Sequence, residues 1–152
     1  MAERDPALRA RVLSALALVP IALAVVWNGG WLFATCVALM VGLMAREWAG
    51  LCSHRFGPRS ARIAGAAVLV VGIASVVLIA SGRPEAALTC LLGGAVLGGL
   101  VAWVFGAPPG WTGLGVVYLG LPALAMVWLR SIPDLGWGLL LALLVVVWTT
   151  DT

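Results

Sequence analysis

The feature that most limits how this chain can fold is a series of long apolar runs, separated by short breaks rich in glycine and proline. A helix that crosses a bilayer needs about 17–25 apolar residues, and no ten-residue alternation typical of a membrane β-barrel is present. The sequence therefore predicts an all-α fold, a polytopic transmembrane helical bundle that forms a single transmembrane region over residues 1–152. The predicted spans, about six, cover residues 12–27, 31–45, 63–80, 86–105, 111–129 and 135–149.

The composition excludes an ordinary soluble domain. Hydrophobic residues make up 63% of the chain and charged residues only 10%. Soluble domains average about 45–50% apolar and about 25% charged residues, and a chain of this size cannot bury so large an apolar excess. Its three cysteines are scattered without a C-x-x-C pair, so neither a disulfide framework nor a zinc site is indicated.

The basic residues, which are all arginines, predict the orientation in the membrane. Arginines concentrate in cytoplasmic loops, so their distribution over alternate loops orients a chain. If all six runs cross the membrane, seven arginines fall on one side and only two on the other, so we expect the N-terminus and the C-terminus in the cytoplasm. The larger set is Arg4, Arg9, Arg11, Arg46, Arg55, Arg59 and Arg62; the smaller is Arg83 and Arg130.

The strongest candidate for chemistry is Asp151, which follows the last apolar run after Trp148 and two threonines. A carboxylate at the cytoplasmic end of a span can hold Mg²⁺ together with substrate phosphates. The alternative is a solvated acid at a helix end. Because no turn or polar tail follows Thr152, we expect a truncated chain that lacks the other half of a site.

Glu47 is a second candidate, next to Arg46 at the expected cytoplasmic end of the second span. It is interpreted either as a substrate-binding group or as half of an interfacial ion pair that ends the helix.

Two groups of arginines are candidates for binding anionic headgroups, each residue contributing about 1 kcal/mol near a membrane surface. One group is Arg55, Arg59 and Arg62, and the other is Arg9 and Arg11. Setting the membrane topology explains the same residues equally well.

Glycines in the fourth span have the spacing of a helix-packing motif. Gly94 and Gly98 form a small-x-x-x-small pattern, which favours close helix packing or a homodimer. No Walker loop, H-E-x-x-H sequence or Ser-His-Asp set accompanies them.

Several of these residues together resemble a known family, the bacterial phosphatidate cytidylyltransferases, or CDP-diacylglycerol synthases. The final WTTDT, residues 148–152, is similar to the start of the family motif W-x-x-D-[ST]-x-A-Y-x-x-G-[RK]. The rest of that motif and the later S-P-x-K-T-x-E-G signature are absent. The other similar stretches, in order, are LRARVLSA (8–15), Pro20, Gly29-Gly30, Arg46-Glu47-Trp48, YLGLP (118–122) and Leu129-Arg130.

The resemblance implies an N-terminal fragment, itself inactive, of an enzyme that converts CTP and phosphatidic acid to CDP-diacylglycerol and pyrophosphate. It implies Mg²⁺ as cofactor, with Asp151 as catalytic residue and metal ligand. The candidates for substrate binding are Arg9, Arg11 and Glu47. The expected partners are these substrates and membrane lipids, without nucleic acid, in the bacterial inner membrane.

Two other functions remain open. One is a non-enzymatic polytopic protein, such as a transporter or scaffold, although its charges would then be expected near the bilayer midplane rather than at the span ends. The other is a related CTP-dependent lipid kinase, which the sequence beyond Thr152 would distinguish.

Overall fold

The structure is a computed structural model that describes residues 19–150, and every regular element in this part of the chain is an α-helix. The predicted all-α class is confirmed for these residues. The helical residues Val19–Asn28 are followed by α2 (Gly30–Phe56), α3 (Pro58–Ala80), α4 (Pro84–Val104), α5 (Pro109–Ser131) and α6 (Gly136–Thr150).

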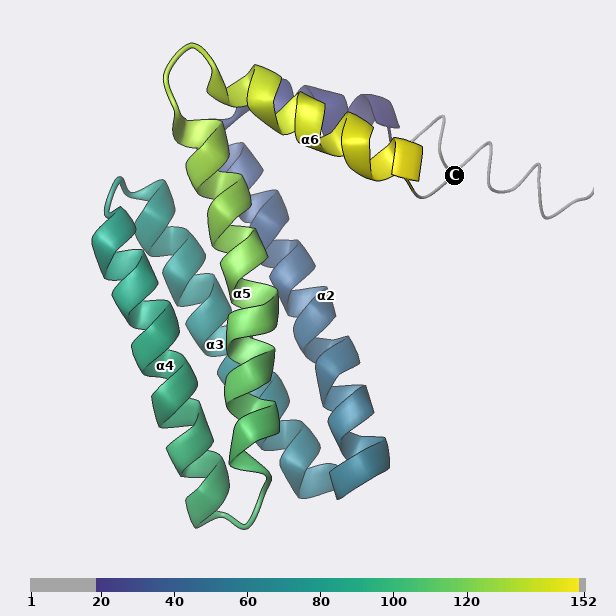
Figure 1. Cartoon of the computed structure of the whole chain (residues 1–152), viewed down its shortest axis with the longest axis vertical. Helices are drawn as coiled ribbons and strands as arrows, with labels where there is room; N and C mark the ends of the chain where they lie inside the picture. Colours follow the sequence, from purple (N-terminus) through teal and green to yellow (C-terminus); the bar gives the residue numbers. More distant parts are fainter. Residues whose placement is uncertain (1–18, 151–152) are drawn as a thin grey trace, which may run out of the picture.

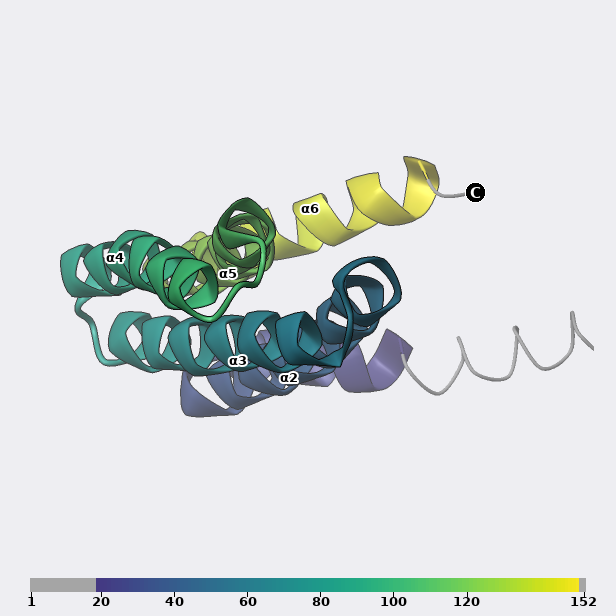
Figure 2. The same cartoon turned by 90° about the horizontal axis from the view of Figure 1, so that it is seen from below.

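Helices α2 to α5 form an antiparallel bundle in which α3 packs against the other three (Figure 1). Figure 2 shows two layers, α4 with α5 above α2 with α3. Helix α6 contacts α5, but it lies across the end of the bundle where α5 ends, as do residues Val19–Asn28 (Figure 1).

Proline and glycine explain where the long helices begin. Pro58, Pro84 and Pro109 each occupy the first turn of a helix, where the missing N–H costs no hydrogen bond. Between α2 and α3 the turn is the single residue Gly57, whose φ of 87° is accessible to glycine but strained for other residues. Helices α2 and α3 therefore form a tight hairpin.

Small residues bring the helix backbones close together inside the bundle. A Cβ atom at Gly94 would collide with the side chain of Val71, and one at Gly98 would lie 3.2 Å from Cβ of Ala67. The close packing predicted for Gly94 and Gly98 is thus formed within the chain, between α4 and α3. The homodimer that the same spacing also favours stays a prediction.

The outer surface of the bundle is apolar, as expected where lipid is the solvent. Large side chains such as Leu39, Val70 and Val96 are more than 60% exposed. Four helices, α2 to α5, are long and apolar enough to cross a membrane among the residues described. A soluble protein rarely exposes so much apolar surface, so this is a membrane protein.

The predicted number of about six spans is too high for the described residues. Residues Val19–Asn28 and α6, with 15 residues, are shorter than the four long helices. A helix of 15 residues is about 22 Å long, less than the ~30 Å of a hydrocarbon core. An apolar run shows that a segment avoids water. Whether that segment runs along the bundle or across its end depends on what it packs against.

The helix that contains the second predicted span is longer than that span. The sequence pattern placed the exit at Arg46-Glu47-Trp48 and a loop up to Arg62, whereas α2 continues to Phe56 and α3 starts at Pro58. Charged side chains do not interrupt the hydrogen bonds of a helix, and nothing before Gly57-Pro58 does so. The predicted loop is therefore mostly helical.

Candidate functional site

Of the predicted site residues, Glu47 lies within the described part of the chain, whereas Arg9, Arg11 and Asp151 lie outside it. The two helices that border the described part extend to the same side of the bundle in both views (Figures 1 and 2). Since these helices run in opposite chain directions, the chain enters at Val19 and leaves at Thr150 on one side.

Arg130, at the end of α5, holds the first of these helices in place. Its Nε donates to the carbonyl of Val26 at 2.5 Å, and its Nη2 donates to the carbonyl of Trp27 at 2.8 Å. These carbonyls belong to the last turn of a helix, where they lack helical partners and where the helix dipole favours a cation. Gly29 makes room, because a Cβ atom there would collide with the guanidinium group.

The other short helix, α6, is fixed at the same place. Gly136 is buried, and a Cβ atom there would lie 2.5 Å from the carbonyl oxygen of Arg130. The rings of Trp27 and Trp137 pack with their centroids 5.3 Å apart. The guanidinium of Arg130 and this indole pair therefore join three elements: residues Val19–Asn28, the end of α5 and the start of α6.

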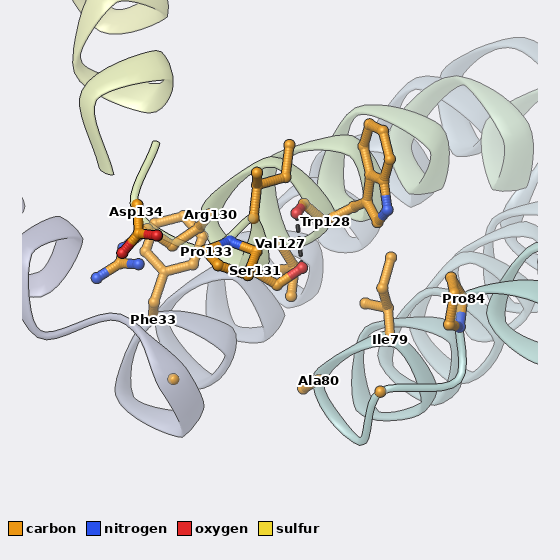
Figure 3. A pocket seen from close by; sticks show the side chains of 13 residues that line it. Phe33, Ile79, Ala80, Pro84, Val127, Trp128, Arg130, Ser131, Pro133 and Asp134 are labelled. Carbon is orange, nitrogen blue, oxygen red and sulfur yellow. Dashed lines mark hydrogen bonds between the residues drawn. The ribbon is translucent and has the colours of Figure 1, made fainter. Parts of the chain in front are cut away.

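Beside this junction is a cavity of about 520 Å³, lined by the start of α2, the ends of α3 and α5, and the start of α4. Figure 3 shows Arg130 and Asp134 on one side of it, and Ile79 and Pro84 on the other. Two polar side chains that line the cavity already have hydrogen-bond partners in the fold. Arg130 donates to two carbonyls, and the hydroxyl of Ser131 donates to the Trp128 carbonyl at 2.6 Å. We interpret the cavity as part of a structural junction.

Glu47 is exposed on α2, nine residues before its end, next to Arg46. Adjacent residues of a helix point in different directions, so the ion pair considered from the sequence is not favoured. The other predicted site residues lie outside the described part of the chain, so the role of Glu47 in substrate binding stays a prediction.

Trp48, the next residue, has a structural role that the sequence did not reveal. Its side chain is buried, its Nε1 donates to the Trp111 carbonyl at 3.3 Å, and its ring lies 5.6 Å from that of Trp111. Gly115 of α5 makes room for the indole, since a Cβ atom there would collide with it. Trp48 therefore joins α2 to α5.

The metal-ligating groups of the described part do not form a cluster. No three His, Cys, Asp or Glu side chains within residues 19–150 lie close enough together to hold a metal ion. The predicted Mg²⁺ ligand, Asp151, lies outside the described residues, so binding of this ion stays a prediction.

Sequence reasoning used Arg130 only in the count of arginines on each side of the membrane and in the family resemblance. Its function in the structure depends on carbonyls more than 100 positions earlier in the chain. The one local signal is its place directly after a long apolar run, where a cation that is not exposed needs a partner.

Comparison with known proteins identifies relatives along nearly the whole chain. The profile described as the cytidylyltransferase family matches residues 9–152. Phosphatidate cytidylyltransferases of Brucella abortus (strain 2308), Brucella suis biovar 1 and Brucella melitensis biotype 1 are each 31% identical to the chain over 145 residues. Each alignment covers 95% of this chain and 52% of the relative, so the chain spans about half the length of the curated relatives it matches. No solved structure is significantly similar to it.

Proposed function

Because the chain belongs to the cytidylyltransferase family, we propose that it is part of a membrane enzyme that makes CDP-diacylglycerol and pyrophosphate from CTP and phosphatidic acid. The observation that carries this proposal is the family match over residues 9–152. The apolar outer surface of α2 to α5 supports it, since the acyl chains of phosphatidic acid stay in the bilayer during the reaction.

In the proposed reaction, an oxygen of the phosphatidic acid phosphate attacks the α-phosphorus of CTP. A new P–O–P bond joins CMP to the lipid, the bond between the α- and β-phosphates breaks, and pyrophosphate leaves. Such transfers depend mainly on positioning and on neutralising charge. When bound, Mg²⁺ supplies part of this neutralisation.

The residues proposed for these tasks are those indicated by the sequence. Asp151 holds the metal ion, and Arg9, Arg11 and Glu47 bind the phosphate-bearing substrates. The entry and exit of the chain at Val19 and Thr150, on one side of the bundle, support a role for both flanking segments in one site. Arg130 acts indirectly, because it positions the helix that enters.

We further propose that the protein lies in the bacterial cytoplasmic membrane with its N-terminus in the cytoplasm. With six crossings, the arginine count places the N-terminus in the cytoplasm, and the even number of crossings returns Asp151 to the same side. Asp151 therefore lies on the side of the N-terminus, where CTP is available.

The test is an assay in detergent with phosphatidic acid, Mg²⁺ and CTP labelled at either the α- or the γ-phosphate. It uses this chain and the longest product of its gene. We expect the longer product to transfer the α-label to lipid, and Asp151→Asn to lower this rate at least about 100-fold, the loss typical of a removed electrostatic contact. Comparable expression and membrane insertion of the variant serve as the control.

The other outcomes separate the alternatives. Transfer of the γ-label alone identifies a lipid kinase. No label in lipid from either chain contradicts the enzyme and favours a transporter or scaffold. An Asp151→Asn variant with full activity contradicts the role of Asp151 but leaves the reaction standing.

A further inference from the structure

A recess of about 280 Å³ lies on the surface between α2 and α3, on the side of the Gly57 turn. It opens outward, away from the interior of the bundle, and two arginines border it. The lining residues are Gly42, Ala45, Arg46, Ala49, Ala61, Arg62, Gly65, Ala66 and Leu69.

The recess exists because both helices carry small side chains at this level. A Cβ atom at Gly65 would lie only 2.8 Å from Cβ of Ala49, so the two backbones are in close contact here. Alanine and glycine leave the space next to this contact unfilled. In a membrane the outer face of the bundle meets lipid, so hydrocarbon is available to fill an apolar recess.

The two arginines have no partner in the structure. Neither Arg46 nor Arg62 has a hydrogen bond or an ion pair within residues 19–150. Arg46 lies about 15 Å of helix before the end of α2 at Phe56, which is well inside the long helix. A charge on the outer surface of an apolar membrane helix is costly unless an opposite charge meets it, which makes Arg46 a candidate binding group.

We propose that this recess binds an anionic phospholipid. The lipid phosphate lies between the guanidinium groups of Arg46 and Arg62, and one acyl chain occupies the recess between α2 and α3. A guanidinium group pairs with a phosphate through two parallel hydrogen bonds, which suits this task. Binding here needs no CTP, so the site does not depend on the proposed transfer reaction.

Neighbouring arginines do not share this arrangement. Arg55 lies over the rings of Phe56 and Trp111, 5.6 and 5.7 Å from their centroids, and thus faces α5. Arg59 is exposed on α3, one turn before Arg62, and does not line the recess. Arg59 therefore provides a matched control for the effect of a nearby charge.

The experiment is a native mass spectrometry titration of the whole chain in detergent, with phosphatidylglycerol as the anionic lipid and phosphatidylcholine as the net neutral one. We expect tighter binding of phosphatidylglycerol. Arg46→Gln and Arg62→Gln should each weaken its binding about fivefold, the effect of one basic residue near a membrane surface. Arg59→Gln should leave it unchanged, and no variant should alter phosphatidylcholine binding.

A second variant tests the recess without removing a charge. Ala66→Leu places a larger side chain in the recess from its exposed rim, and each methylene group displaced should weaken binding about fourfold. Ala125→Leu, at an exposed alanine of α5 outside the recess, is its control.

Two results would overturn the proposal. Equal losses with Arg59→Gln and Arg62→Gln would show a diffuse attraction to the basic end of the bundle. Unchanged phosphatidylglycerol binding in both Arg46→Gln and Arg62→Gln, confirmed as folded by circular dichroism, would show that the recess holds no such lipid.

Discussion

Arg130 at one end of the bundle and Arg62 at the other carry the same guanidinium group but differ in what surrounds it. Arg130 is partly buried and donates to two backbone carbonyls. Arg62 is exposed at the edge of an apolar recess and has no partner within residues 19–150. The first cation has its partners supplied by the fold, whereas the second is free to bind an anion from the membrane.

The largest expected effect is at the junction. Arg130→Ala removes two charge-assisted hydrogen bonds and leaves the carbonyls of Val26 and Trp27 without a partner, so the free energy of unfolding should fall by about 3 kcal/mol. Thermal unfolding in detergent measures this, and Arg130→Lys should recover part of the loss. A variant as stable as the wild type would refute the structural role assigned to Arg130.

The contact between α2 and α5 at the opposite end should be somewhat less sensitive. Gly115→Ala places a Cβ atom against the buried indole of Trp48, which should lower the free energy of unfolding by about 1–3 kcal/mol, as overpacking does. Gly110→Ala, in the same helix with nothing within 4 Å, is the control and should not destabilise. Equal effects at the two glycines would argue against this packing.

A smaller loss is expected for the indole pair beside Arg130. Trp27→Leu removes the ring contact with Trp137, worth about 1 kcal/mol beyond the area that it buries. The control is Trp103→Leu, which changes a side chain that is equally exposed, at 70%, and that has no ring partner within residues 19–150. The difference between the two unfolding temperatures isolates the pair, and no difference would mean that Trp137 contributes nothing.

The smallest effect completes the comparison. Arg62→Gln should change the free energy of unfolding by no more than about 0.5 kcal/mol, because no contact within the described chain is lost. The same unfolding experiment without added lipid measures it. A loss as large as that of Arg130→Ala would mean that Arg62 stabilises the fold and would remove the contrast between the two ends.

The sequence predicts much of the fold because local chemistry determines it. Long apolar runs give helices, and Pro58, Pro84 and Pro109 mark three helix starts. The prediction failed at Arg46-Glu47-Trp48, where charges were interpreted as a boundary although no residue there breaks a helix. It also failed for the direction of α6, which depends on packing at the end of α5.

Less of the candidate site was predictable. Arg9, Arg11 and Asp151 lie outside the described residues, so their roles stay predictions. The role of Arg130 and the recess beside Arg62 depend on elements meeting in space, which apolar periodicity does not encode. Family resemblance indicated the reaction, but the contacts of these two arginines required the structure.

The hydrogen bonds of Arg130 also bear on the order in which the protein assembles during synthesis. Arg130 binds a carbonyl 104 positions earlier in the chain, so this bond cannot form until nearly all of the described chain has left the ribosome. At about 5–20 residues per second, roughly 5–20 seconds separate the synthesis of its two partners. The helix at Val19–Asn28 can therefore be fixed in place only after α5 has been made, whereas the hairpin of α2 and α3 can form much earlier.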